Sequence, residues 1–174
     1  MIELMSATSD GKALRRAFGC FPSGVTAICG LRDGLAVGMA ASAFTSVSLD
    51  PPLVSLCVQN SSTTWPKLRE LARLGISVLA EDHADACLQL SGKAEDRFVG
   101  IEWSASTEGA VFMEHATAWL DCSVEREVPA GDHTMVILRI HRFLADPAVA
   151  PLVFHASRFR RLVAVEPVPP AGQA

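Results

Sequence analysis

Two short segments of the sequence combine residue types that suit ligand binding. The first runs from Gly38 to Ser48, GMAASAFTSVS, and mixes small side chains with hydroxyls. Because small side chains let a ligand come close to backbone N–H groups, this segment suits the edge of a flat ring system. A small-residue strand packed against a helix has the same composition, so both interpretations stand at this point.

The second segment is Asn60 to Thr64, NSSTT, directly before a Trp-Pro pair. Proline is favoured in the first turn of a helix, so a helix is predicted to start near Trp65. Hydroxyls and free N–H groups at such a start can bind phosphate, although plain capping of the helix uses the same residue types. Together, the two segments describe a mononucleotide lying between a small-residue edge and a helix start.

Signatures of the common catalytic sites do not occur in this sequence. It contains no GxGxxG, no GxxxxGK[ST] and no GxSxG. The histidines, at positions 83, 115, 133, 141 and 155, lack the spacing of a metal site. His133 and His141 are expected on one face of one strand, but far apart along it. We therefore expect no metal.

The composition is that of an ordinary globular domain. The chain has 174 residues, 49% hydrophobic and 20% charged, which allows one domain with a sizeable core. Its net charge of −4 argues against nucleic acid, which needs a basic surface. No stretch approaches the roughly 20 apolar residues of a membrane span, and residues 1–12 lack the order of a secretory signal. A cytoplasmic protein is expected.

The five cysteines are interpreted as small buried hydrophobes. Their number is odd and no pair has CxxC spacing, so neither a disulfide framework nor a zinc site is indicated. Cys29, Cys57 and Cys122 lie inside apolar, strand-like runs, a setting typical of inert thiols.

Strands outnumber helices in the hydrophobic pattern. Strands are expected at residues 25–30, 35–39, 53–58, 76–80, 116–126, 134–144 and 152–155. Helices are expected through Leu14–Phe21 with a cap at Ser9 or Asp10, from Trp65 to a C-cap at Gly75, and from a cap at Asp82 to Leu90. Asp33-Gly34 predicts a hairpin, and residues 129–132 predict a turn.

This order of elements lacks a regular alternation of strand and helix. A polar segment at 91–109 and the Asp50-Pro51-Pro52 break interrupt the strands. We expect a single mainly β domain over residues 1–165, an antiparallel barrel with peripheral helices. A disordered Pro/Ala tail is expected at residues 166–174.

The sequence resembles the flavin reductase-like domain family over nearly its whole length. These proteins are FMN-binding split β-barrels, antiparallel and Greek-key-like, and serve as reductase components of two-component monooxygenases. The matching blocks are FGCFPSGVTAIC (18–29), VGMAASAFTSVSLDPPLVSLCV (37–58), SSTTWPKLRELARLGISVLAEDH (61–83), DRFVGIEW (96–103), CSVEREVPAGDHTMVILRI (122–140) and PLVFHASRFRRL (151–162).

The resemblance implies a homodimer with flavin sites near the subunit interface, and it implies roles by position. The isoalloxazine and ribityl would contact Ala40, Ala41, Ser42, Ser46, Val47 and Ser48, largely through backbone groups. The flavin phosphate would lie near Ser61, Ser62 and Thr63, with Arg97 and Phe98 in an acidic-basic-aromatic segment beside the flavin. The nicotinamide would meet the Gly131-Asp132-His133 motif and a bordering segment with His155, Arg158 and Phe159.

Two departures from the family concern flavin retention. Many relatives carry Asn-Ser where this chain has Ser42-Ala43, and often Thr at the position of Ala40. Fewer side-chain contacts would weaken retention, or suit a protein that releases flavin as a substrate, and both interpretations remain open.

The implied activity is hydride transfer from NADH to FMN or FAD, with the reduced flavin passed to a partner monooxygenase. Such a transfer needs no protein nucleophile, because the chemistry belongs to the cofactors. His133 is the candidate catalytic residue, as the group that orients the nicotinamide nucleotide, although a turn residue is the alternative. NADPH is less expected than NADH, since no basic cluster awaits a 2′-phosphate. The competing functions are a flavin carrier or sensor without turnover, and an enzyme whose tightly bound flavin oxidises another small substrate.

Overall fold

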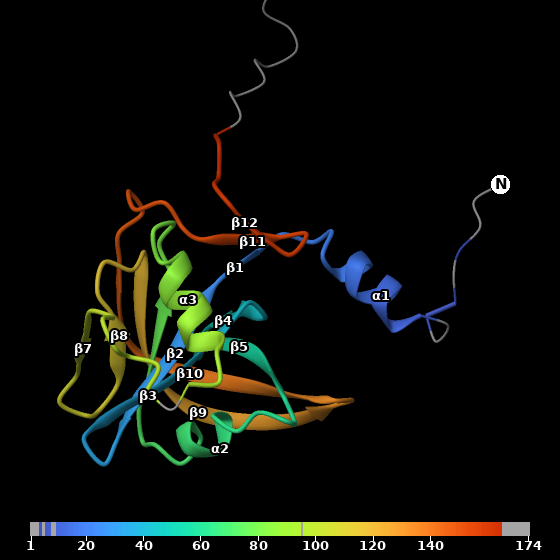
Figure 1. Cartoon of the computed structure of the whole chain (residues 1–174). Coiled ribbons are helices and arrows are strands. Elements are labelled where there is room, and N and C mark those ends of the chain that lie inside the picture. The colour runs from blue at the N-terminus through green and yellow to red at the C-terminus, as the bar shows by residue number, and fades with distance from the viewer. Residues whose placement is uncertain (1–3, 5, 8–9, 95, 165–174) are drawn as a thin grey trace, which may run out of the picture.

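Antiparallel strands dominate the structure, a computed structural model that describes residues 4, 6–7, 10–94 and 96–164 (Figure 1). The main sheet has the order β3-β2-β6-β9-β10-β5-β4, and every neighbouring pair is antiparallel. Because β5 pairs with β10 and β6 with β9, strands distant in sequence lie side by side. The bounds are β2 (Thr26–Arg32), β3 (Leu35–Ala41), β4 (Phe44–Leu49), β5 (Pro52–Gln59), β6 (Leu74–Val78), β9 (Ala118–Ala130) and β10 (His133–Ala145).

A seam between β3 and β4 keeps the main sheet from closing. These strands stand at opposite ends of the sheet, although only residues 42–43 separate them in sequence. Met39 of β3 and Phe44 of β4 nevertheless pack against the same buried cluster, so the sheet curls around one core. The expected mainly β split barrel is confirmed.

Smaller elements surround the barrel. A three-stranded sheet and a short hairpin lie beside it, in the order β1-β11-β12 and as β7-β8. Their bounds are β1 (Ser23–Gly24), β7 (Trp103–Ala105), β8 (Val111–Met113), β11 (Val153–His155) and β12 (Arg158–Arg160). The helices are α1 (Gly11–Phe18), α2 (Trp65–Leu68) and α3 (Ala84–Ser91). No helix in the described part of the chain is long and apolar enough to cross a membrane.

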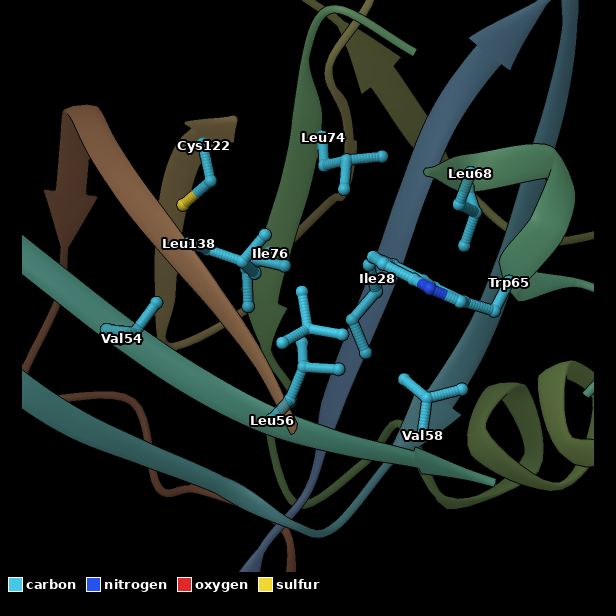
Figure 2. Packing of buried hydrophobic residues seen from close by; sticks show 11 residues of the cluster. Ile28, Val54, Leu56, Val58, Trp65, Leu68, Leu74, Ile76, Cys122 and Leu138 are labelled. Carbon is cyan, nitrogen blue, oxygen red and sulfur yellow. The ribbon is translucent and has the colours of Figure 1, made fainter. Parts of the chain in front are cut away.

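The barrel core is built from side chains of several strands and one helix (Figure 2). Ile28, Leu56, Ile76 and Leu138 are fully buried, and Leu68 of α2 packs with them. Branched apolar residues on alternate strand positions fill such an interior because successive side chains point to opposite faces. A second cluster lies on the other face of β2, which is therefore buried on both sides.

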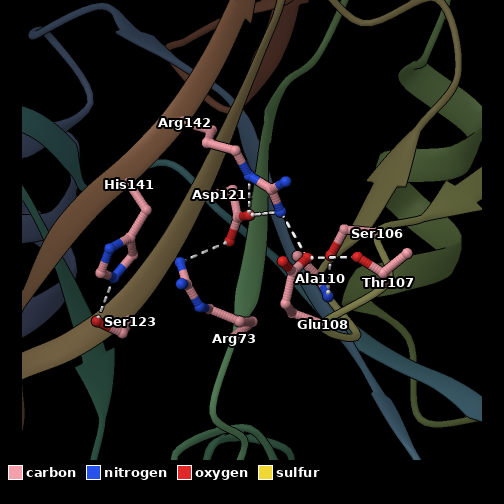
Figure 3. A network of polar contacts seen from close by, with 9 residues as sticks. All are labelled: Arg73, Ser106, Thr107, Glu108, Ala110, Asp121, Ser123, His141 and Arg142. Carbon is pink, nitrogen blue, oxygen red and sulfur yellow. Dashed lines mark hydrogen bonds and ion pairs between the residues drawn. The ribbon is translucent and has the colours of Figure 1, made fainter.

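A buried carboxylate on β9 is held by two arginines, one on β10 and one just before β6 (Figure 3). Asp121 of β9 is 3% exposed and accepts hydrogen bonds from Arg142 at 2.6 and 3.0 Å and from Arg73 at 3.4 Å. Arg142 also bonds Glu108 at 2.6 Å and holds the pKa of that carboxyl at about 2. The pairing compensates the cost of burying the Asp121 charge.

Both expected hairpin turns are present. Asp33 and Gly34 have φ of 53° and 79°, the left-handed conformation that a two-residue hairpin requires. Gly131 has φ of 66° in the turn between β9 and β10. These glycines allow tight turns where other residues would be strained.

The first helix differs in extent from its prediction. Asp10 caps it, accepting from the backbone N of Lys12 at 2.8 Å, but it ends at Phe18, before Phe21. The other expected cap, Ser9, lies outside the described residues. No residue of α1 is buried, and the helix stands away from the barrel (Figure 1).

Two further helix boundaries were predicted wrongly. The helix at Trp65 ends at Leu68, and Gly75 lies inside β6. A Cβ at Gly75 would collide with the backbone of Val111, so this glycine serves the close approach of β8. The cap of α3 is His83 and not Asp82, and the His83 Nδ1 accepts from the backbone N of Ala80 at 3.1 Å.

Some short strands were not predicted, and one predicted segment lies outside the described residues. The strands that were not predicted are β1, β4, β7, β8 and β12, and β7 lies within the segment at 91–109 that was expected to be polar and without regular structure. The predicted tail at 166–174 lies outside the described residues. All five cysteines are free thiols, and burial raises the pKa of Cys29 and of Cys122 to about 12.

Candidate functional site

One cavity of about 840 Å³ collects most of the expected site residues. It lies where the seam end of β3, the end of β5, the loop before α2 and the end of α3 come together. Its lining includes these expected residues: Ala40, Ala41, Ser42, Ser61, Ser62, Thr63, Arg97 and His133. Cavities of this size accommodate cofactors.

The small-residue edge of the cavity is the end of β3. This strand pairs with β2 on one side only, so its outer edge offers backbone groups without ladder partners. The side chains of Ala40 and Ala41 leave that edge open, and Thr26 fixes it by donating to the Ala41 carbonyl at 3.0 Å. The geometry suits a flat ring that hydrogen-bonds with backbone groups.

The hydroxyl-rich loop before α2 forms another part of the cavity lining, and Ser62 Oγ donates to Met39 Sδ of β3 at 3.9 Å. Ser62 Oγ accepts from the backbone N of Trp65 at 3.1 Å, so the predicted capping is real, although Ser62 does it and not Thr64. Because α2 has only four residues, its dipole is small. Anion binding at this loop therefore depends on hydroxyls and on a neighbouring cation.

Arg97 is that cation. Its Nη1 donates to Thr64 Oγ1 at 3.1 Å and to the Leu90 carbonyl at 3.2 Å, and its Nε donates to the Ala94 carbonyl at 3.3 Å. These contacts fix the guanidinium without neutralising it, since no carboxylate among the described residues pairs with Arg97. A fixed, unpaired guanidinium next to hydroxyls suits a phosphate.

His133 stands at the start of β10, on the wall shared with Gln59. Its Nδ1 lies 2.7 Å from the Asp132 carboxylate, and this hydrogen bond lowers the Asp132 pKa. The His133 side chain is 34% exposed, so a ligand in the cavity can reach it. The carboxylate restricts the imidazole orientation, as such partners do in other histidine sites.

A smaller, apolar cavity of about 250 Å³ adjoins the main one along Ala40, Ala41 and Ser42. Phe159 lines it, packed edge-on against Phe154 with ring centroids 5.7 Å apart. His155 and Arg158 are paired across the β11–β12 hairpin but line neither of these two cavities. The structure thus brings Phe159 to the site and leaves the other two at its margin.

The remaining expected residues lie elsewhere. Ser46, Val47 and Ser48 belong to the edge strand β4, where the register shifts between Ser46 and Ser48, and none lines the main cavity. Phe98 lines a third cavity beside Arg97.

Several lining residues were not anticipated from the sequence. They are Cys57, Val58, Gln59, Leu90, Ser91, Gly92 and Lys93. These residues lie at or just after the ends of β5 and α3, and only the tertiary fold brings the two ends together.

Comparison with known proteins gives this geometry a family. Residues 18–163 match the flavin reductase-like domain. The chain is 32% identical over 164 residues to a flavin reductase of Pseudomonas putida, covering 94% of this chain and 96% of that protein. It is 34% identical over 147 residues to HsaB, the reductase subunit of a flavin-dependent monooxygenase of Mycobacterium tuberculosis, covering 84% of this chain and 79% of HsaB.

A solved structure agrees in fold. The NADH:FAD oxidoreductase SgcE6 of Streptomyces globisporus C-1027, in complex with NAD and FAD fragments, matches with a TM-score of 0.86 and 34% identity. The match covers 98% of this chain and all of that chain (100%). This protein therefore belongs to the flavin reductase-like domain family.

Proposed function

We propose that the protein transfers a hydride from NADH to a flavin and supplies the reduced flavin to a partner monooxygenase. One observation carries the proposal: a single cavity joins an open strand edge, a hydroxyl end with the unpaired Arg97, and His133. The strand edge suits a flat ring, the hydroxyls with Arg97 suit a phosphate, and His133 suits a second nucleotide. The relatives named as flavin reductases support the same reaction.

The residues present fit a flavin. The backbone edge at Ala40–Ser42 would meet the rim of the isoalloxazine, and Ser61–Thr63 with Arg97 would hold the phosphate. A bound flavin supplies the acceptor atom for the hydride. Backbone N–H donors at the ring edge would also stabilise negative charge on the reduced ring, because fixed donors need no reorganisation.

The contacts of His133 support a role in orienting the nicotinamide nucleotide. Asp132 holds its Nδ1, which leaves Nε2 for a ligand in the cavity. We propose that His133 contacts the nicotinamide nucleotide and brings the two rings within about 3–3.5 Å, the separation that transfer requires. His133 would thus act on positioning and would not exchange the hydride itself.

Two finer features complete the proposal. NADH is proposed over NADPH, since Arg97 is the only arginine among the described residues that line the main cavity, and it is assigned to the flavin phosphate. A cytoplasmic location is proposed because the five cysteines are free thiols, as in a reducing compartment.

A homodimer is also proposed. Val128 and Met135 are cross-strand partners on β9 and β10, each 39% exposed, and Val47 and Leu49 are exposed on the edge strand β4. Apolar side chains on a sheet face suit a contact between subunits. Light scattering coupled to size exclusion tests this: a dimer that Met135→Asp dissociates is expected, whereas a wild-type monomer contradicts it.

Steady-state NADH oxidation tests the proposed reaction. The rate is expected to saturate with added free flavin, which is the behaviour of an enzyme that uses flavin as a substrate. A yellow protein that is inert toward NADH would instead be a carrier. Oxidation that needs no added flavin but does need another small substrate would show a bound-flavin enzyme of a different reaction.

A further inference from the structure

The segment that carries Arg97 forms no helix or strand among its described residues, 92–94 and 96–102. It connects α3 with β7 and brings Arg97 to the main cavity. Backbone groups in such a segment have no ladder partners, so its position depends on individual contacts. The hydrogen bonds that hold the backbone at residue 97 therefore decide where the Arg97 side chain starts.

The side-chain amide of Gln89 on α3 makes those contacts. Its Nε2 donates to the carbonyl oxygen of Arg97 at 3.1 Å and to that of Val99 at 2.8 Å. A primary amide nitrogen carries two donors, so one side chain satisfies both carbonyls. Gln89 is half-buried and lines none of the three cavities around the site. It therefore acts on a ligand through the residues that it holds.

The other hydrogen bonds described for the backbone of residues 97–101 are local. The backbone N of Phe98 donates to Asp96 Oδ1 at 3.0 Å, and the backbone N of Ile101 donates to the Phe98 carbonyl at 3.1 Å. The Phe98 side chain packs against the second apolar cluster, which anchors the segment but does not orient its carbonyls. Gln89 therefore provides the hydrogen-bonded link between this backbone and α3.

The guanidinium of Arg97 is held by the next residue of the same helix. Its Nη1 donates to the Leu90 carbonyl at 3.2 Å and to Thr64 Oγ1 at 3.1 Å. Gln89 and Leu90 thus fix the two ends of Arg97 from α3, and the guanidinium lies at the hydroxyl-rich loop. A side chain held at both ends has lost its rotamer freedom before a ligand binds, which favours affinity.

We infer that Gln89 is a positioning residue for the flavin phosphate and acts through Arg97. The inference rests on the proposed function, in which Arg97 meets that phosphate, and adds a residue that the ligand does not touch. A flavin without a phosphate gains nothing from Arg97. Riboflavin has the ring and the ribityl chain of FMN without the phosphate, so the two flavins separate this role from general support of the cavity.

Binding of FMN and riboflavin to the full-length protein, followed by quenching of flavin fluorescence, tests the inference. The wild type is expected to bind FMN about tenfold more tightly than riboflavin, as for a hydrogen bond to a charged group. Gln89→Leu keeps a helix-favouring side chain of similar size but removes both donors. It is expected to weaken FMN binding about fivefold and to leave riboflavin binding within about twofold of the wild type. Asp85→Asn is the matched control, since Asp85 is an exposed residue of α3 that lines none of the three cavities, and it should bind both flavins as the wild type does.

Arg97→Met and a double variant that combines it with Gln89→Leu complete a double-mutant cycle. The double variant is expected to bind FMN no more weakly than Arg97→Met, because Gln89 acts through that arginine. Additive losses would overturn the inference, as would equal losses for FMN and riboflavin, or an unchanged FMN affinity in Gln89→Leu. A wild type that binds the two flavins equally would contradict the proposed phosphate contact itself, which distinguishes the two failures.

Discussion

Asn60 donates a hydrogen bond from Nδ2 to the carbonyl oxygen of Gly131 at 3.2 Å, across 71 residues of sequence. Its backbone N donates to the Asp132 carbonyl at 3.0 Å, and its Oδ1 accepts from Thr134 at 3.0 Å. Asn60 thus joins the loop that carries the cavity hydroxyls to the turn that carries His133. The hydrogen bonds of this one residue therefore hold the hydroxyl-rich loop against the turn before β10.

Loss of these hydrogen bonds in Asn60→Ala is predicted to weaken the binding of both NADH and flavin. Both the KM for NADH and the dissociation constant for flavin are expected to rise, by about fivefold to tenfold, because each side-chain hydrogen bond contributes roughly 1 kcal/mol. Steady-state kinetics and flavin titration measure the two constants. Thr134→Val, which removes only the bond to Oδ1, should change both constants less. A variant with wild-type constants would show that the turn holds its position without Asn60.

His133→Ala is predicted to act on one ligand alone. The KM for NADH should rise about tenfold, as expected for loss of a hydrogen bond to a charged group of the nucleotide, while the KM for flavin stays within about twofold. His141→Ala is the control, because His141 bonds Ser123 at 2.8 Å and does not line the main cavity. An unchanged KM for NADH would remove His133 from the proposed role.

The barrel core sets the stability of the site. Leu138→Ala is expected to lower the free energy of unfolding by about 3 kcal/mol, because Leu138 is fully buried among Ile28, Leu56 and Ile76. Urea unfolding followed by circular dichroism measures the change. Leu35→Ala, at a side chain 73% exposed, should have little effect. Equal losses in the two variants would contradict the assigned core.

Acid stability should depend on Glu108. Arg142, by its hydrogen bond, lowers the folded pKa of Glu108 to about 2 from an ordinary value of 4.5. A depressed carboxyl pKa contributes stability that is fully present above the unfolded pKa and is lost as pH falls through the folded pKa. Between pH 4.5 and pH 2, the Tm of the wild type is therefore expected to fall more steeply than that of Glu108→Gln. Glu102→Gln, which leaves Arg142 untouched, should follow the wild type, and parallel slopes for all three proteins would refute the role.

The sequence carried enough information for the barrel and for much of the site. Short apolar runs predicted most strands, and Asp33-Gly34 and Gly131 predicted the hairpins at their correct places. The predicted helix end at Gly75 was wrong because it was inferred from local sequence alone. Gly75 instead allows close contact with Val111, which belongs to a strand and comes 36 residues later. Tertiary packing overrides local propensity in such cases.

The site, like the fold, could be predicted from the sequence only in part. Ala40–Ser42 and Ser61–Thr63 were expected to contact one mononucleotide, and both segments line the same cavity. The long-range hydrogen bonds of Asn60 could not be predicted, because helix capping and long-range bonding use the same amide group.

Direct observation of the hydride step tests the central proposal most closely. Protein, flavin and NADH are mixed anaerobically, and the loss of oxidised-flavin absorbance is followed with NADH deuterated at either face of C4. The proposed function predicts rapid loss that needs the protein, slows for one deuterated face only, and weakens in His133→Ala at low NADH. Flavin that stays oxidised in the presence of protein and NADH would contradict it.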